Sequence, residues 1–287
     1  MQNSSGNYIE IPVSKEILEN AVRILQHHTT TLIKVAKDYS GAEKSIHIGS
    51  GTFVQIEDAY GIITAQHVAK QLDGPCHLGL TIDTAYHRYL IPKDHLGVFE
   101  LAMPVTEEWG PDLAFIGIPA AEVGTIRASM SFYNLSSHRQ EQIQNPRLID
   151  TGAWVLCGAP EVTVKSEGPK RGYRKALAFE HFACEGLLIN EMTRDAFDYV
   201  EMPIDHSLYT KTPPTFKGMS GGGLWQLLIE QNSAGEVRVK SFVLSGVIFY
   251  QTELIDNKRS VRCHFRKSLY QYGYAEIVKR LREAVND

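Results

Sequence analysis

Two kinds of hydrophobic pattern follow one another along the chain. Residues 14–37 carry apolar side chains at helical spacing, and Ser14 is placed to cap the first turn, so this segment predicts an N-terminal helix. Short apolar runs bounded by Gly, Pro or Asn occupy residues 51–250, and most are too short for helices. Residues 274–284 return to helical spacing. The pattern therefore predicts a mainly β protein with a helix near each end.

The strand-like runs fall into two groups separated by a polar stretch at residues 136–146, which predicts an exposed loop between two halves. The short polar segment at residues 57–60 looks like a hairpin connection between the first two runs. No internal sequence repeat is evident. The predicted strands are residues 51–56, 61–65, 77–82, 113–118, 153–157, 187–189, 223–228 and 237–250.

Composition narrows the class of protein. The 287 residues are 43% hydrophobic, which is enough to build a substantial core, and the formal net charge is -4. A mildly acidic chain has no basic surface for phosphate, so nucleic acid is not an expected partner. The start of the chain lacks a basic segment followed by an apolar one, and no apolar run is long enough for a membrane span, so neither secretion nor a membrane partner is expected.

The cysteines point to a reducing environment. The chain has 4 cysteines, they lie far apart, and none forms a C-x-x-C pair, so their spacing predicts neither a disulfide framework nor a zinc site. The histidines show no H-E-x-x-H or comparable ligand spacing either. We therefore expect a cytoplasmic protein with reduced thiols and no bound metal.

Three segments carry residues suited to acyl transfer. Such chemistry needs a hydroxyl nucleophile, a base beside it, an acid that orients the base, and backbone donors for the oxyanion. The run GMSGGG at residues 218–223 sets Ser220 among glycines, which permit a tight turn, and the amides of Gly218 and Ser220 form a candidate oxyanion hole. His67 stands at the end of an apolar strand as a candidate general base, and Asp112 stands just before another strand as its orienting acid.

The order histidine, aspartate, serine, each in its own motif, resembles the trypsin and chymotrypsin superfamily, especially its bacterial trypsin-like peptidases. The likeness spans residues 49–250: GSGTFV before the histidine strand, T-A-x-H around His67, D-L-A-F-I from Asp112, and G-x-S-G-G around Ser220. The segment WVLCGAP at residues 154–160 is similar to the start of the second barrel in these enzymes.

The resemblance implies two six-stranded antiparallel β-barrels with the site in the cleft between them. The parts would be an N-terminal helical extension (residues 1–45), a first barrel with His67 and Asp112 (46–140), a second barrel with Ser220 (141–270) and a C-terminal helix (271–287). It also implies a serine endopeptidase that acts through an acyl-enzyme, needs no cofactor and processes a specific protein or peptide substrate.

The sequence departs from the family at two informative places. Met219 replaces an aspartate that pairs with a freed N-terminus in digestive relatives, so that activation switch is expected to be absent and an activating protein partner is conceivable. The substrate pocket is expected to involve Pro214, Thr215, Phe249, Tyr250 and Gln251. Without an acid at its floor, and with Gln251 narrowing it, the pocket is expected to take a small or apolar side chain.

Two other functions fit parts of the sequence. An α/β-hydrolase would use the same G-x-S-x-G run followed by Asp256 and His264, but the glycines after Ser220 disfavour the helix that must follow its nucleophile. A peptidase-like fold that is catalytically silent, or gated by a partner, would act as a peptide-binding module.

Overall fold

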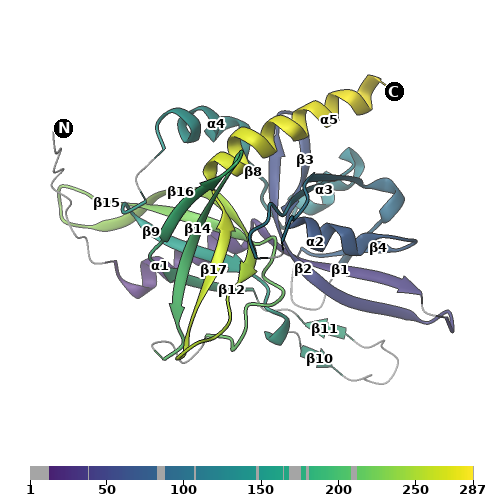
Figure 1. Cartoon of the computed structure of the whole chain (residues 1–287), viewed down its shortest axis with the longest axis horizontal. Helices are drawn as coiled ribbons and strands as arrows, with labels where there is room; N and C mark the ends of the chain where they lie inside the picture. Colours follow the sequence, from purple (N-terminus) through teal and green to yellow (C-terminus); the bar gives the residue numbers. More distant parts are fainter. Residues whose placement is uncertain are drawn as a thin grey trace.

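The computed structural model contains two antiparallel β-sheets, which lie side by side with helices around them (Figure 1). The structure describes residues 13–37, 39–82, 88–106, 108–146, 149–163, 165–167, 176–178, 181–207 and 212–286. The predicted mainly β fold with two antiparallel sheets and terminal helices is confirmed. Among the described residues the sheets have eight and seven strands, rather than the six expected in each.

The first sheet is formed by the N-terminal half of the chain in the order β5-β4-β1-β2-β3-β7-β6, and β8 adds to β2 in parallel. Its long β1 and β2 form a hairpin that extends away from the body at the right of Figure 1. Its strands are β1 (Thr29–Lys37), β2 (Glu43–Ile56), β3 (Ala59–Thr64), β4 (His77–Thr81), β5 (Arg88–Pro92), β6 (Gly97–Ala102), β7 (Leu113–Gly117) and β8 (Tyr133–Asn134).

The second sheet has the order β12-β9-β15-β16-β17-β14-β13, and the short strands β10 and β11 pair separately. Its centre, β15 and β16, is the longest paired segment of this half. Its strands, with the separate pair, are β9 (Ala153–Gly158), β10 (Lys165–Glu167), β11 (Ala176–Ala178), β12 (Phe182–Gly186), β13 (Ile189–Arg194), β14 (Phe197–Asp205), β15 (Gly223–Gln231), β16 (Val237–Gln251) and β17 (Lys258–His264).

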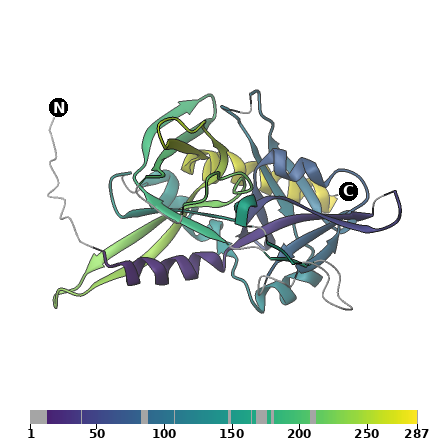
Figure 2. The same cartoon turned by 90° about the horizontal axis from the view of Figure 1, so that it is seen from below.

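The helices lie around the two sheets. α1 runs along the lower side, as the view from below shows, and α5 crosses the top (Figures 1 and 2). They are α1 (Lys15–Gln26), α2 (Gln66–Ala69), α3 (Ala120–Arg127), α4 (Leu135–Gln144) and α5 (Tyr274–Asn286), with the short turns η1 (Lys70–Leu72), η2 (Lys93–His95) and η3 (Glu161–Thr163) and the π-helical η4 (Lys267–Gly273). Across the described residues, no helix is both long enough and apolar enough to cross a membrane.

Two boundaries predicted from the sequence are wrong. The predicted helical extension over residues 1–45 is helical only at Lys15–Gln26 within its described part, and Thr29–Lys37 is a strand of the first sheet. The β-branched run Thr29, Thr30 and Thr31 favours a strand, and pairing with β2 and β4 buries it. The predicted loop at residues 136–146 is largely α4, which begins where the Asn134 side chain caps the amide of Ser137.

Among the described residues the core is formed by two hydrophobic clusters. The larger one joins the first sheet to β15, β16 and α5, and includes Phe53, Phe115 and Trp225, all fully buried. The smaller one fills the second sheet around Trp154 and Met202. Because the larger cluster reaches into both sheets, it fixes their relative position and with it the space between them.

Candidate active site

The histidine and the aspartate come from paired strands of the first sheet. His67 lies in α2, directly after β3, and Asp112 lies directly before β7. β3 and β7 pair with Thr64 opposite Ala114, so the two residues leave the sheet at the same end. Asp112 Oδ2 lies 2.5 Å from His67 Nδ1, and Asp112 Oδ1 accepts a hydrogen bond from the His67 backbone amide at 3.0 Å. Both carboxylate oxygens therefore hold the histidine.

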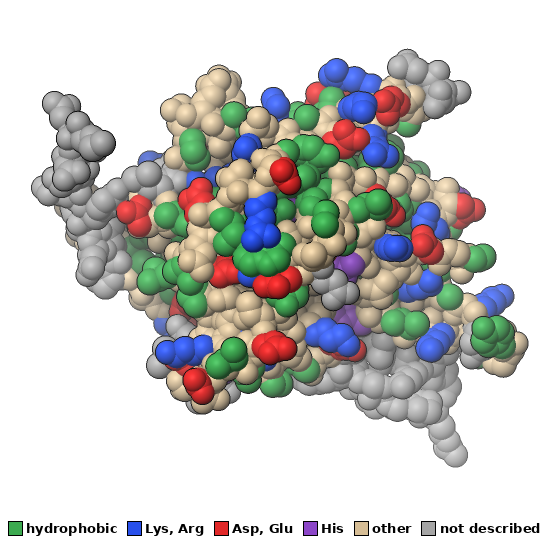
Figure 3. All heavy atoms as spheres, in the orientation of Figure 1, with side chains coloured by type: hydrophobic (Ala, Val, Ile, Leu, Met, Phe, Trp, Pro, Cys, Tyr) green, Lys and Arg blue, Asp and Glu red, His purple; other side chains and the backbone are tan. Residues whose placement is uncertain are grey.

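Burial differs sharply between these two side chains. The Asp112 side chain is 3% exposed, whereas that of His67 is 44% exposed. A buried carboxylate paired with a half-exposed ring leaves the far nitrogen, Nε2, open to a substrate and to proton transfer. In the orientation of Figure 1, histidine side chains reach the surface near the middle of the molecule, among interspersed acidic and basic groups (Figure 3).

Ser220 reaches the same cavity from the second sheet, just before β15. The cavity has a volume of about 590 Å³ and is lined by His67, Asp112 and Ser220 together. The Ser220 hydroxyl donates to the Phe249 carbonyl at 3.4 Å, a long hydrogen bond. The three residues predicted from the sequence as nucleophile, base and acid therefore face one space between the two sheets.

The amides of Gly218 and Ser220 are free and have a fixed direction. Lys217 O accepts from Glu161 N at 2.7 Å, and Met219 O accepts from Gly222 N at 2.8 Å. In a trans peptide the N–H points opposite to the carbonyl. The Gly218 amide therefore points away from Glu161 N, and the Ser220 amide points away from Gly222 N. Within the described part of the chain neither amide donates to another group. They are suitably placed donors for an oxyanion.

Gly218 is required at its position by both conformation and space. Its φ is 93°, a left-handed conformation that L side chains adopt rarely, and a Cβ would lie 2.8 Å from Glu161 N and 2.9 Å from Ala159 O. Gly218→Ala is therefore expected to displace the first candidate oxyanion donor. If the site performs acyl transfer, this change should lower kcat about 10²- to 10³-fold, with a much smaller change in KM. Steady-state kinetics on a peptide substrate measure this effect. A loss below threefold would contradict the assigned role of this amide.

Ser50 ties the nucleophile loop to the first sheet, a role the sequence did not reveal. Its hydroxyl donates to Gly218 O at 2.7 Å and accepts from Ala159 N at 2.8 Å. Its backbone amide also donates to Ser220 O at 2.9 Å. The only sequence signal was its position in the GSGTFV run. Through Ser50 the first sheet, which carries His67, directly fixes the loop that carries Ser220.

His264 and Arg262 of β17 contact the segment that ends in Asp112, and sequence reasoning missed both roles. His264 Nε2 accepts a hydrogen bond from Asp112 N at 2.9 Å, and Arg262 donates to Glu108 O. The α/β-hydrolase alternative that used His264 is wrong. Ser220 leads into the strand β15 and not into a helix, and both main sheets are built from antiparallel neighbours except at β8.

The predicted substrate pocket is partly assembled. Phe249, Tyr250 and Gln251 line the cavity, whereas Pro214 is exposed and lies outside the lining, with Phe216 in its place. The Gln251 side chain is held in the cavity wall by several hydrogen bonds. Thr215 does not line the cavity, but it helps to hold Gln251 in place, since Gln251 Nε2 donates to its hydroxyl at 2.8 Å. Gln251 Oε1 accepts from Phe216 N at 2.8 Å and from Arg259 at 2.7 Å.

Met219 serves as an apolar anchor for the nucleophile loop. Its side chain is fully buried in the smaller core cluster and packs against Gly158. A buried thioether cannot pair with an ammonium group, so the loop is held at this position by packing and not by an ion pair. No group of three or more His, Cys, Asp or Glu side chains that could hold a metal ion is found in the described ranges.

The comparisons with known proteins give similarity of fold. No protein family model matches the chain, and no curated protein does. The solved structures similar to it include tobacco vein mottling virus protease, at 9% identity and a TM-score of 0.39, covering 91% of this chain and 84% of that one. A Sesbania mosaic virus structure, from work on folding and binding of the VPg protein, has 13% identity and a TM-score of 0.42, covering 84% and 88%. At these identities the likeness concerns the fold alone.

Proposed function

We propose that this chain is a serine endopeptidase of the trypsin-like type. The observation that carries the proposal is the meeting of the His67–Asp112 pair, the Ser220 hydroxyl and two free amides around one cavity. Acyl transfer requires these four elements together, and each alone is common in proteins that have no such activity.

The geometry supports a specific sequence of proton transfers. Ser220 Oγ attacks the substrate carbonyl while His67 Nε2 takes its proton, and Asp112 holds the Nδ1–H and stabilises the imidazolium. The amides of Gly218 and Ser220 stabilise the oxyanion. His67 then protonates the leaving amine, and an acyl-enzyme on Ser220 remains. Water, deprotonated by His67, attacks this ester and releases the acid and the free serine.

The cavity walls favour a peptide with a small or apolar side chain before the cleaved bond. Phe216, Ile248 and Val261 contribute apolar surface, and Gln251 occupies space in the cavity wall, where it is held by its bonds to Thr215 and Phe216. The acidic side chains in the described lining are already paired, Asp112 with His67 and Glu161 with Lys217 at 2.9 Å, so Lys or Arg gains little from this pocket. The substrate class we propose is therefore a protein segment with an uncharged residue at this position.

An activated serine reacts with a fluorophosphonate, which tests the proposal without a known substrate. We expect intact-mass spectrometry to show one adduct on the wild-type protein and none on Ser220→Ala or His67→Ala, because labelling needs both nucleophile and base. Ser241→Ala, at an exposed serine on β16, is the matched control and should label as the wild type does. An adduct that persists in Ser220→Ala would reject the assignment of the nucleophile.

One observation favours a second candidate, a peptidase-like module that is silent or becomes active when a partner binds. The Ser220 hydroxyl donates to the Phe249 carbonyl, and no hydrogen bond joins it to His67 in the described structure. Catalytic hydrogen bonds are often loose before substrate binds, so this geometry is also compatible with the peptidase. An unlabelled wild-type protein would favour the second one.

A further inference from the structure

Strand β17 of the second sheet presents two side chains to the segment that carries the acid of the first sheet. Arg262 and His264 are two residues apart, so both point to the same face of the strand. Residues 108–112 lie against that face, with Glu108 and Trp109 near Arg262 and Asp112 near His264. Asp112 is therefore held from the second sheet, although its partner His67 belongs to the first.

His264 supplies an acceptor to the backbone of Asp112. Its ring is fully buried and packs against Phe249, Tyr199 and Phe197, with ring centroids 4.9, 5.1 and 5.8 Å away. Nε2 accepts from Asp112 N at 2.9 Å, so this nitrogen carries no proton and the neutral ring is protonated on Nδ1. Burial lowers the pKa of His264 to about 4, so the acceptor form persists at neutral pH.

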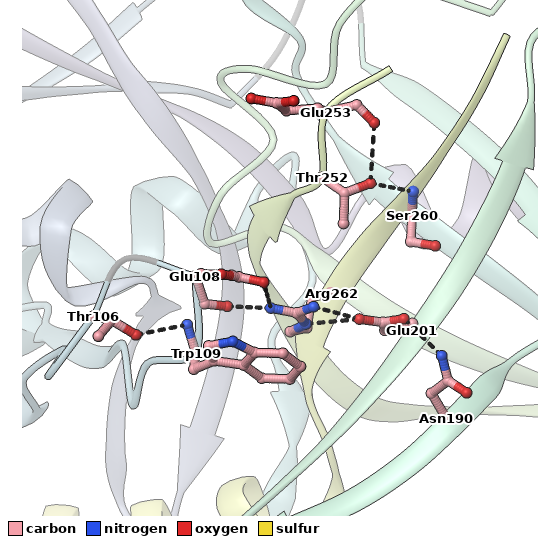
Figure 4. Close-up of polar contacts among 9 residues, drawn as sticks. All are labelled: Thr106, Glu108, Trp109, Asn190, Glu201, Thr252, Glu253, Ser260 and Arg262. Atoms are coloured by element: carbon pink, nitrogen blue, oxygen red, sulfur yellow. Dashed lines mark hydrogen bonds and ion pairs between the residues drawn. The ribbon is translucent and has the colours of Figure 1, made fainter. Parts of the chain in front are cut away.

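Arg262 fixes the same segment three to four residues earlier. Its side chain is 3% exposed and pairs with Glu201 of β14 at 2.5 Å. The guanidinium carbon lies 3.6 Å from the centre of the Trp109 ring, and the side chain donates to Glu108 O. Figure 4 shows the guanidinium between Glu108 and Glu201, alongside the Trp109 indole.

Further contacts of Glu201 and Trp109 make the contact between Arg262 and the 108–109 segment rigid. Glu201 also accepts from Asn190 Nδ2 at 2.9 Å, and Arg194 places its guanidinium carbon 3.7 Å from the Trp109 ring centre. A buried guanidinium bonded on several sides has one low-energy orientation, because losing any partner leaves a charge without compensation. The backbone at Glu108 and Trp109 is therefore fixed just before the chain reaches Asp112.

We infer that His264 and Arg262 are positioning residues for catalysis, through which β17 holds the Asp112 backbone so that both carboxylate oxygens meet His67. This inference rests on the proposed function. The two hydrogen bonds that Asp112 accepts from His67, 2.5 and 3.0 Å long, depend on the backbone at residue 112. A displacement of about 1 Å in such a group can cost about 100-fold in rate.

Two variants of His264 distinguish its role as a hydrogen-bond acceptor from its role in packing. His264→Gln keeps an oxygen at the same number of bonds from Cβ as Nε2, whereas His264→Leu fills the site without an acceptor. His28→Leu is the matched control, since His28 is also a buried histidine, 7% exposed, among Tyr133, Trp225 and Phe242. Arg262→Lys keeps the charge but loses the planar stacking on Trp109, and tests the second contact.

The first measurement is NMR of protein labelled with ¹⁵N-histidine, which needs no turnover. The proton shared by His67 Nδ1 and Asp112 should resonate far downfield in the wild type and in His264→Gln. It should broaden or move upfield in His264→Leu, because the carboxylate no longer holds the ring nitrogen in the same position. The other titratable side chains lining the cavity remain unchanged in these variants: His47, Glu161, Lys217 and Tyr250.

The second measurement is the rate at which Ser220 reacts with a fluorophosphonate. We expect a 10- to 100-fold loss in His264→Leu, a smaller loss in Arg262→Lys, and rates within about threefold of wild type in His264→Gln and His28→Leu. If the NMR signal is the same in His264→Leu as in the wild type, the inference is overturned. If the NMR signal responds as expected but the wild type is never labelled, the positioning stands and the proposed peptidase activity fails.

Discussion

Changing Asp112 to Asn is expected to lower kcat/KM for peptide hydrolysis about 10⁴-fold. The carboxylate accepts from both His67 Nδ1 and the His67 backbone amide. An amide side chain has only one acceptor atom, so its NH₂ group must face one of these positions. If NH₂ faces Nδ1, the ring proton moves to Nε2, where it blocks proton transfer from Ser220. Stopped-flow or steady-state kinetics of the wild type and the variant at neutral pH measure this loss of activity.

Glu100→Gln provides the matched control for this change. Glu100 lies on β6 and accepts from the side chain of Gln66, the residue before His67, at 3.1 Å. It is a carboxylate-to-amide change near the same histidine without contact to its ring. We expect activity within about threefold of wild type. An Asp112→Asn variant that keeps more than a tenth of wild-type activity would show that Asp112 does not set the tautomer of His67.

The residues of the candidate site could be predicted because each one lies in a short sequence motif. His67 follows one apolar run and Asp112 precedes another. Because the two strands formed by these runs pair at that end, the two residues come together. The glycines around Ser220 encode the turn, because Gly218 and Gly221 adopt φ values of 93° and 89°. These features depend on a few neighbouring residues each, which is the range over which a single sequence is informative.

The supporting contacts could not be predicted because they join residues far apart in the chain. His264 lies 152 positions from Asp112, and Ser50 lies 168 from Gly218. Nothing near His264 distinguishes a buried acceptor from an ordinary strand histidine. The helix predicted through residue 37 failed for a related reason: apolar spacing in residues 29–37 suits a helix, but pairing with two strands decides the structure.

The arrangement of the chain explains why the two sheets must move as one body for this site to work. The first sheet supplies His67 and Asp112, and the second supplies Ser220. Ser50 reaches from the first sheet to the nucleophile loop, and His264 reaches from the second to the acid. Each half therefore holds a candidate site residue that belongs to the other, so under the proposed function a shift between the sheets would disturb both ends of the proton-transfer path at once.

Buried histidines are expected to make the protein lose stability as the pH falls from 6.5 to 4. Burial lowers the pKa of His28 and of His264 from 6.5 to about 4. Between these values the unfolded chain binds protons that the folded chain excludes, so the free energy of unfolding rises with pH in this window and is fully regained above pH 6.5. Each tenfold change in proton affinity corresponds to about 1.4 kcal/mol, which gives roughly 3 kcal/mol for each histidine. Burial lowers the pKa of further histidines in the same direction: His47, His138, His181 and His206.

Urea unfolding at several pH values between 4 and 7.5 measures this dependence. His28→Gln should reduce the slope between pH 4 and 6.5 by up to about 1.4 kcal/mol per pH unit, because one proton fewer is taken up on unfolding. Asp205→Asn is the control: hydrogen bonds from Ser207 lower the pKa of that partly exposed carboxyl below 3.8, so the folded protein does not titrate there within the window. A free energy of unfolding that stays level from pH 4 to 6.5 would mean that the buried histidines accept protons in the folded state. In that case His264 could not keep Nε2 as the acceptor for Asp112 in acid, and labelling of Ser220 would fall together with its protonation.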